Sequence, residues 1–358
     1  MRLFSLPSLL VLMAAMMLAV WGILILYSLR PTLIDSQSFA LGLGILSFAI
    51  LIQIPLDWTK NHSWVWWIIA IGLLILPLIL GSVVRGSARW IDIGPVRFQP
   101  AEFTRPLLLM SFAGFLQGAA PSMDKLVKAM LVLGIPFALI RAEPDLGSAL
   151  LLASVWFGVL IQSGINWRYL VFGLVLVIIS APIIWSVLHD YQRERIITFI
   201  NPTHDTLGAG YNVIQAQIAI GSGKLLGKGF GQGTQSQLRF LPENHTDFIF
   251  ASLAEEFGFV GSTGVLMLYG VIMIVAIRVV TDPQQSQYHR LIVAGVLMGL
   301  ATQLFINIGM NLGIMPVTGV TLPLVSYGGS SMISTWISLA LVVNAAIRKP
   351  KQVLTHIH

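Results

Sequence analysis

One aspartate stands at the border between a polar stretch and a strongly apolar one. The segment "PENHTDFIF" (242–250) places Glu243, His245 and Asp247 directly before an apolar run, and Glu243 and His245 are candidates for substrate binding. An Asp at the start of a helix ordinarily serves as its N-cap. No second acid stands at a fixed spacing from Asp247, so a two-carboxylate glycosidase pattern is not recognisable.

A second acidic position precedes another apolar run. In "RAEPDLGSALLL" (141–152), Glu143 and Asp145 flank a proline. Asp145 stands where the N-cap of the next helix is expected. The alternative is that Asp145 binds a cation or orients a substrate. Ionisable residues at membrane depth are costly, so each of them needs a partner or a function.

Two arginines in the segment 86–105 are candidates for different tasks. Glu102 and Arg105 are three residues apart, so they share a helix face and are expected to form a structural ion pair. Contact of this pair with substrate is the alternative. Arg89 lies beside Trp90 and is the better candidate for a phosphate-bearing ligand at the membrane interface.

A glycine-rich stretch adds cations and flexible backbone. The run "GSGKLLGKGFGQGTQSQ" offers Lys224, Lys228 and backbone amides that suit a sugar-phosphate, although it can also be a merely flexible loop. It contains no Walker A motif, so nucleotide hydrolysis is disfavoured. The preceding "YNVIQAQIAI" predicts a short amphipathic helix lying in the interface.

Three further residues complete the candidates for substrate binding. Arg193 and Arg195 lie in the polar run "HDYQRERIITF", where they can offset the charge of a phosphate. Ser326 opens "SYGGSS", whose small residues let helices pack closely or leave backbone open to a cavity. The histidines are scattered and the chain has no cysteine, so no metal site is predicted from protein ligands.

The chain around these residues is that of an integral membrane protein. Of its 358 residues, 56% are hydrophobic and only 10% are charged, and the mean hydropathy is +0.83. Soluble domains carry about 25% charged residues. The net charge of +6 is explained by Lys and Arg that flank membrane spans and meet anionic lipid headgroups, so nucleic acid is not an expected partner.

Long apolar runs predict an all-α polytopic bundle of about ten transmembrane helices, forming one membrane domain over residues 1–358. Residues 85–102 and 189–247 are predicted as extracytoplasmic loops, the longer one between helices 7 and 8. Lys and Arg are more frequent in the short loops on the side of the termini, which predicts both termini in the cytoplasm. The predicted spans are 7–28, 37–56, 64–84, 103–118, 126–141, 147–163, 168–188, 248–277, 291–312 and 323–347.

This topology gathers the candidate residues on the outer side of the membrane. A lipid-linked phosphate compound handled at the outer leaflet fits such a site. The residues alone do not separate a transporter from an enzyme.

The same motifs resemble those of the SEDS family (shape, elongation, division and sporulation), and within it the rod-shape subgroup more than the division subgroup. The resemblance covers essentially the whole chain. The segments that carry it are "GSARWIDIG", "FQPAEFTR", "EPDLGSALL", "GAGYNVIQAQIAIGSG", "GKGFGQGTQSQLRFLPENHTDFIFASLAEEFGFVG" and "TLPLVSYGGSS".

The resemblance implies a ten-helix peptidoglycan glycosyltransferase in the bacterial inner membrane. Such proteins polymerise lipid II, an undecaprenyl-pyrophosphate-linked disaccharide peptide, and work with a class B penicillin-binding protein that makes the crosslinks. Asp247 matches the essential aspartate of the family's "HTDFIF" motif, and we expect it to be the general base. A divalent cation such as Mg2+ can share the task of offsetting the pyrophosphate charge.

The chain departs from the family pattern at two positions. Arg105 stands where rod-shape members often have Lys, which puts a proton-transfer role for this position in doubt. Glu143 stands where the family commonly has Gln, and it adds a charge near Asp145.

Two rival functions predict different behaviour. A lipid II flippase explains the spans and buried charges equally well, but alternating access usually places the site near the middle of the membrane. A scaffold that only recruits a penicillin-binding protein predicts that Asp247→Asn is tolerated.

Overall fold

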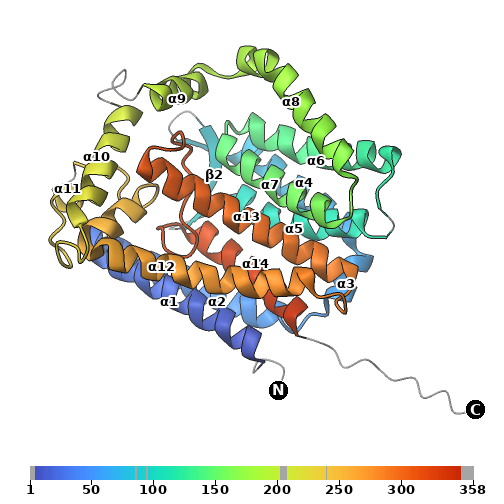
Figure 1. Cartoon of the computed structure of the whole chain (residues 1–358), viewed down its shortest axis with the longest axis horizontal. Coiled ribbons are helices and arrows are strands. Elements are labelled where there is room, and N and C mark those ends of the chain that lie inside the picture. The colour runs from blue at the N-terminus through green and yellow to red at the C-terminus, as the bar shows by residue number, and fades with distance from the viewer. Residues whose placement is uncertain are drawn as a thin grey trace, which may run out of the picture.

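The computed structural model is a bundle of long helices, as the sequence predicts, and it describes residues 5–84, 87–93, 96–118, 120–201, 208–238 and 240–347 (Figure 1). Helices satisfy every backbone polar group within one segment, which lipid requires. The longer helices are α1 (Leu6–Leu29), α2 (Ile34–Leu51), α4 (Ser63–Leu80), α5 (Pro100–Leu116), α6 (Met123–Ala142), α7 (Leu146–Gln162), α8 (Trp167–Val187), α12 (Ile249–Thr281), α13 (Gln287–Leu312) and α14 (Gly329–Ala346). Two short ones, η2 (Pro31–Leu33) and α3 (Leu56–Asn61), connect them.

Each predicted span overlaps one of the longer helices, but the predicted spans 37–56 and 64–84 end too late, because α2 ends at Leu51 and α4 at Leu80. Within the described part of the chain, six segments are long and apolar enough to cross a membrane, namely α1, residues 31–51, α4, α12, α13 and α14. The last predicted span begins too early, because residues 323–328 form turns before α14 starts. Leu324 in these turns has φ 64°, a conformation that no helix continues through.

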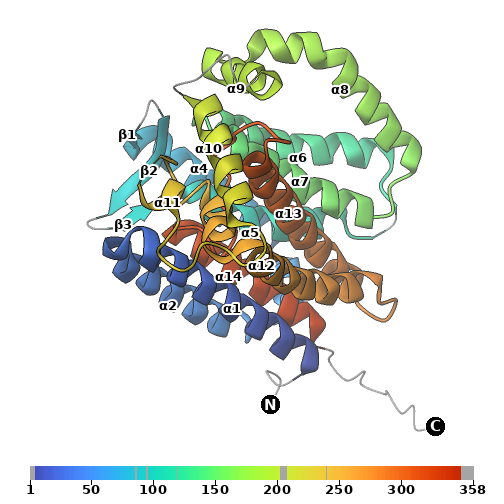
Figure 2. The same ribbon diagram turned by 60° about the vertical axis from the view of Figure 1, so that its left-hand side comes forward.

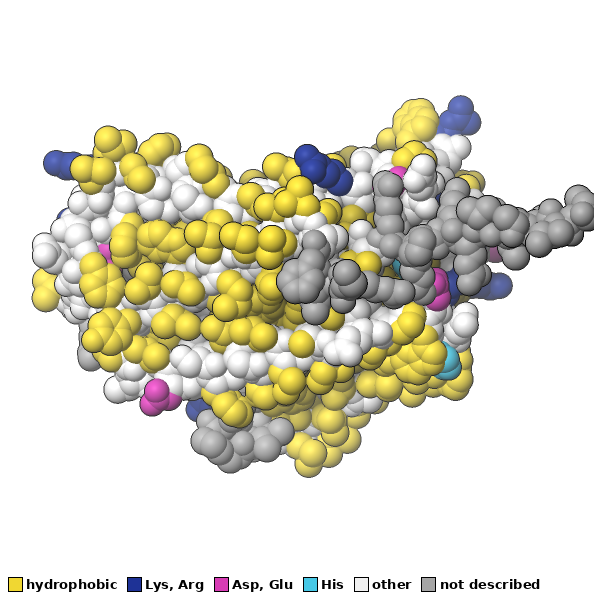
Figure 3. Space-filling model, turned by 90° about the horizontal axis from the view of Figure 1, so that it is seen from below, with side chains coloured by type: hydrophobic (Ala, Val, Ile, Leu, Met, Phe, Trp, Pro, Cys, Tyr) yellow, Lys and Arg dark blue, Asp and Glu magenta, His cyan; other side chains and the backbone are white. Residues whose placement is uncertain are grey.

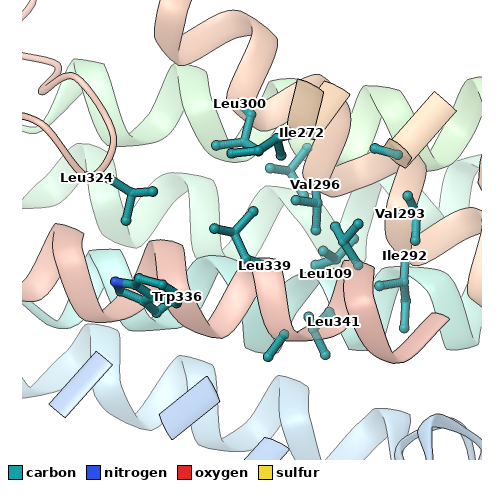
Figure 4. Close-up of a cluster of buried hydrophobic side chains, with 14 of the residues drawn as sticks. Leu109, Ile272, Ile292, Val293, Val296, Leu300, Leu324, Trp336, Leu339 and Leu341 are labelled. Atoms are coloured by element: carbon teal, nitrogen blue, oxygen red, sulfur yellow. The ribbon is translucent and has the colours of Figure 1, made fainter. Parts of the chain in front are cut away.

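The core lies where α13 packs against α7, α12, α5 and α14. Figure 4 shows Leu109, Ile272, Val296 and Leu339 pointing toward one another from four of these helices. Helices in lipid associate through close packing rather than through a hydrophobic driving force. Gly158 of α7 illustrates this packing, since a Cβ there would lie 2.6 Å from the carbonyl oxygen of Ala294.

A small antiparallel sheet has two strands in the predicted loop 85–102 and one in the last residues of the predicted span 64–84. Its strands are β1 (Ser82–Val84), β2 (Ser87–Ile93) and β3 (Val96–Phe98). Trp90 pairs with Ser82, and Asp92 pairs with Arg97. Val83 pairs with Ala88, so the register shifts at Arg89, and this arginine is the extra residue of a bulge between two paired positions of β2.

The long segment before Asp247 also contains helices, α9 (Asp190–Ile200), α10 (Ala209–Gly223) and α11 (Thr234–Gln237). α10 confirms the short helix predicted from "YNVIQAQIAI", and its place in the interface stays a prediction. α8 and α9 arch away from the rest of the bundle (Figures 1 and 2), and no described side chain of α8 is buried.

Candidate active site

Asp247 lies in a tight turn just before α12. The amides of Thr246 and Phe248 both donate to the carbonyl of Glu243, at 3.2 Å each, and Glu243 adopts φ 53° to make this turn. The N-cap residue of α12 is Phe248, so the prediction of Asp247 as the N-cap is wrong by one residue.

Two amide side chains of α13 hold the backbone of Asp247. Asn307 Nδ2 and Asn311 Nδ2 each donate to the Asp247 carbonyl at 3.0 Å, and neither asparagine is exposed. Asn311 Oδ1 accepts the amide of Ala251 at 3.0 Å, so it satisfies a first-turn donor of α12 from a neighbouring helix. The sequence interpretation missed both residues, although amides spaced by four in an apolar helix are a readable signal.

The turns before α14 close over the same segment. Ser326 Oγ donates to the carbonyl of Thr246 at 2.7 Å, and the amide of Tyr327 donates to the carbonyl of His245 at 2.9 Å. The rings of His245 and Tyr327 lie 5.9 Å apart. Ser326 and His245, both predicted to bind substrate, therefore have backbone-holding contacts next to Asp247.

Gly319 brings the same turns close to the carboxylate. A Cβ on Gly319 would lie 3.7 Å from Asp247 Oδ2, and Gly319 has φ 76°, which suits glycine. The backbone therefore passes directly beside the Asp247 side chain.

Asp145 forms a second acidic centre at the α6–α7 turn. It is the N-cap of α7, as predicted, and accepts the amide of Ser148 at 3.0 Å. Gln99 Nε2 donates to its other oxygen at 3.2 Å. Arg89 Nη1 lies 3.9 Å from Asp145 Oδ1, and its guanidinium also donates to the carbonyls of Glu143 and Pro144. The structure therefore ties Arg89 to this turn.

Arg195 of α9 connects the two acidic centres electrostatically. Burial lowers the pKa of Arg195, and the charge of Asp247 is the largest influence that opposes this shift, with Asp145 acting in the same direction. Arg195 therefore lies within electrostatic reach of both carboxylates. Its guanidinium carbon is 5.7 Å from the ring centre of Tyr191. It also lines a small cavity with Thr198, Phe199, Val213, Gly313, Met315, Pro316 and Val317.

Arg193 lies at the corner between α8 and α9. Its guanidinium donates to the carbonyls of Trp185 and Ser186, at 3.1 and 2.9 Å, and forms an ion pair with Asp190 at 3.5 Å. Arg193 thus satisfies the terminal carbonyls of α8.

Lys228 of the glycine-rich segment binds an internal carboxylate. Its ammonium lies 2.9 Å from Oε1 of Glu255, whose side chain is fully buried. The amides of Gln235 and Ser236 donate to the same carboxylate at 2.9 and 3.0 Å. Several of the donors predicted to bind a polyanion therefore bind the Glu255 carboxylate of the protein itself. Lys224 is exposed at the end of α10.

The predicted ion pair between Glu102 and Arg105 is confirmed within α5, and both side chains are buried. Arg105 Nη1 also donates to Gln303 Oε1 at 3.2 Å, and Ser334 Oγ donates to the carbonyl of Glu102 at 2.6 Å. The pair thereby joins α5, α13 and α14.

Metal ligands do not cluster within the described ranges. No group of three or more His, Asp or Glu side chains there is arranged to hold a metal ion. A cation at this site would need most of its ligands from a bound substrate.

Comparison with known proteins places the chain in one family. Residues 2–351 match the family model for FtsW, RodA and SpoVE, described as cell cycle proteins. The peptidoglycan glycosyltransferase MrdB of Escherichia coli K12 is 39% identical over 344 residues, covering 94% of this chain and 92% of MrdB. A probable peptidoglycan glycosyltransferase FtsW from Thiomicrospira cyclica is 37% identical over 313 residues, covering 86% of this chain and 80% of that protein.

Solved structures show the same fold. A chain from a study of how a peptidoglycan synthase complex coordinates polymerization and crosslinking matches with a TM-score of 0.81 and 32% identity, covering 94% of this chain and 96% of that chain. Crystalline RodA from Thermus thermophilus matches with a TM-score of 0.70 and 30% identity, covering 94% and 95%. The expected resemblance to the SEDS family and its rod-shape branch is confirmed, and the chain belongs to the FtsW–RodA–SpoVE family of cell cycle proteins.

Proposed function

We propose that this chain polymerises lipid II into glycan strands at the outer face of the membrane, with Asp247 as general base. The chain is a peptidoglycan glycosyltransferase and a multi-pass protein of the bacterial inner membrane. The position of the Asp247 carboxylate supports the base assignment, because it precedes α12, lies beside Gly319 and is within electrostatic reach of Arg195.

The reaction is a single displacement at an anomeric carbon. The 4-hydroxyl of one sugar attacks this carbon, and its proton passes to an Asp247 carboxylate oxygen as the new C–O bond forms. The bond between the anomeric carbon and the pyrophosphate oxygen breaks. Undecaprenyl pyrophosphate leaves as a stable anion, so no protein acid is needed. Inversion converts an α-linked donor into a β-linked product.

Arg195 and Arg89 are the cations best placed to offset the pyrophosphate charge. Arg195 is half-buried and within electrostatic reach of Asp247, and a cation partly shielded from water stabilises developing charge more strongly. Arg89 is fixed by its bonds to the α6–α7 turn, so it offers charge without reorganisation. Lys228 pairs with Glu255, and we assign it no role in this step. A divalent cation bound mainly by the pyrophosphate would add to the same effect.

We further propose a class B penicillin-binding protein as the partner. The support is the match to a chain from a peptidoglycan synthase complex that couples polymerization and crosslinking. Growing glycan would then be released beside the enzyme that crosslinks it.

Polymerisation of lipid II by the purified complex tests the proposal. Asp247→Asn keeps the size of the side chain but cannot accept the proton, so we expect long glycan from the wild type and loss of at least about 100-fold in kcat from the variant. Asp92→Asn, which alters an exposed acid on β2 paired with Arg97, is the control and should retain normal turnover.

Other outcomes separate the alternatives. Normal polymerisation by Asp247→Asn contradicts the base assignment. Transport of lipid II across vesicle membranes, with no polymer from an intact wild-type complex, favours the flippase. Neither transport nor polymer, with the complex intact, favours the scaffold.

A further inference from the structure

The carbonyl of Asp247 receives two buried amide donors from the same helix. Asn307 and Asn311 are one turn apart on α13, and each Nδ2 lies 3.0 Å from this oxygen. The second proton of Asn307 goes to the Val320 carbonyl at 2.8 Å, and that of Asn311 goes to the Asn307 carbonyl at 2.8 Å. Both amides thus use their full donor capacity on backbone oxygens.

The chemistry of the site fixes the orientation of these amides. Asn307 Nδ2 faces the carbonyl oxygens of Asp247 and Val320, so a flipped amide would set three acceptors against one another. Asn311 Oδ1 accepts the Ala251 amide, which also excludes a flip. Both amides therefore present an N–H group to the Asp247 carbonyl.

Packing alone does not explain two buried asparagines in an apolar helix. Burying an amide costs free energy unless its partners are supplied, and an aliphatic side chain would fill the same space without that cost. Three of the four donated bonds go to the non-helical backbone around the carboxylate, two at Asp247 and one at Val320 next to Gly319, and the fourth goes to the Asn307 carbonyl within α13. Fixing the Asp247 carbonyl also fixes its Cα and hence the direction of its side chain.

The same face of α13 extends this support by one more turn. Gln303 Nε2 donates to the Thr321 carbonyl at 3.0 Å, while its Oε1 accepts from Arg105. The row Gln303, Asn307, Asn311 therefore binds both segments that border the carboxylate, and the buried Glu102–Arg105 pair supports its first member.

We propose that Asn307 and Asn311 are positioning residues that hold the Asp247 carboxylate in its reactive direction. The inference rests on the proposed role of Asp247 as general base. Neither asparagine need touch the substrate, because both act through the Asp247 backbone. A small misplacement of a catalytic group can cost about 100-fold in rate, so the effect should appear in kcat.

Asn311→Leu and Asn307→Leu remove the donors with little change in volume. We expect each to lower kcat for lipid II polymerisation by about 10- to 100-fold and to change KM by less than about threefold. Asn344→Leu is the matched control. Asn344 lies near the end of α14, and its Nδ2 donates to the carbonyls of Leu51, Ile52 and Ile54. Asp247 lies at the other end of this helix, beside Ser326, which precedes the start of α14. This control should lower the melting temperature and leave kcat unchanged.

Two further measurements keep the outcome decisive. In an Asp247→Asn background, Asn311→Leu should cause no additional loss, because no base remains to be aimed. If a leucine variant does not fold, Asn307→Ser and Asn311→Ser, which retain a hydroxyl, should show the same loss of kcat at constant KM. Folded variants with wild-type kcat, or with losses shared by Asn344→Leu, overturn the proposal. Full activity of Asp247→Asn alone would instead reject the base assignment.

Discussion

Glu143 is the acid whose surroundings least suit a charge. Its side chain is fully buried at the α6–α7 turn, and within the described residues neither carboxylate oxygen has a hydrogen-bond partner. The pKa of Glu143 is raised from 4.5 to about 8, chiefly by burial and also by the nearby charge of Asp145, while Arg89 opposes both. At neutral pH the neutral acid therefore predominates, close in shape to the glutamine common in the family.

This shift predicts a pH-dependent difference in stability. The unfolded chain loses the Glu143 proton near its ordinary pKa of 4.5, while the folded protein keeps it up to about 8. Between these values the folded state binds more protons, so the free energy of unfolding falls as pH rises, by up to about 1.4 kcal/mol per unit. Glu143→Gln removes this slope and should gain melting temperature relative to wild type from pH 5 to pH 8.

Melting curves in detergent at several pH values check this expectation. Asp124→Asn, which removes an exposed acid from α6, controls for the lost charge and should run parallel to wild type. Parallel curves for Glu143→Gln as well would contradict a buried neutral Glu143.

At the scale of single residues, charge was easier to predict than amide chemistry. Asp145 as an N-cap and the Glu102–Arg105 pair followed from spacing, because ionisable groups stand out in an apolar chain. Asn307 and Asn311 carry no charge, and their target is the backbone of a residue 60 or more positions away. Such a partner is set by the tertiary fold and cannot be read from local spacing.

At the scale of elements, a break in α12 is repaired by the glycine-rich segment. Gly258 has φ 66° and interrupts the helix. The amides of Lys228 and Gly229 donate to the carbonyls of Glu255 and Glu256, at 2.9 and 3.0 Å. In return, the amides of Phe259 and Val260 donate to the carbonyls of residues 224 and 225, at 2.9 and 3.1 Å. The two backbones thus replace the hydrogen bonds that the break removes.

This contact predicts a severe effect from a single methyl group. A Cβ on Gly227 would overlap the backbone carbonyl of Glu256, and Gly227 has φ 82°. Neither backbone can yield, so Gly227→Ala should destabilise the protein by about 2–4 kcal/mol. Gly221→Ala in α10 is the matched control, since its Cβ meets nothing within 4 Å, and it should gain up to about 1 kcal/mol. Thermal melting of both variants measures the difference.

Equal melting temperatures for Gly227→Ala and Gly221→Ala would show that the glycine-rich segment and α12 do not cross this closely.

The sequence predicted the apolar run of α12 but not its break, because Gly258 requires a positive φ only where another segment crosses. The sheet of β1 to β3 was not predicted either, because strands of three to seven residues show little periodicity in the sequence.

At the scale of the whole molecule, the bundle presents an apolar exterior to lipid. Figure 3 shows rows of hydrophobic side chains across one face, with charged side chains sparse among them. Long apolar runs made this architecture predictable, since hydropathy alone reports burial in a bilayer. The direction of insertion depends on charges in the loops, which the fold itself does not fix, and we propose that both termini are cytoplasmic.

The orientation of the protein in the membrane decides which leaflet Asp247 faces. Residues near the two ends of α12 can report this orientation. Gly258 interrupts this helix, and the part after it, residues 259–281, is about 35 Å long at 1.5 Å per residue, so the two ends of this part lie on opposite sides of an apolar layer of about 30 Å. Asp247 precedes one end, and the turn with the exposed Gln284 follows the other.

The chain has no cysteine, so a single introduced thiol reports the side of the membrane on which it lies. Gln232→Cys, in the exposed segment beside α12, should react with an impermeant maleimide on intact spheroplasts, whereas Gln284→Cys should react only after permeabilisation. The reverse pattern would place Asp247 toward the cytoplasm, where a polymerase acting on the outer leaflet has no substrate.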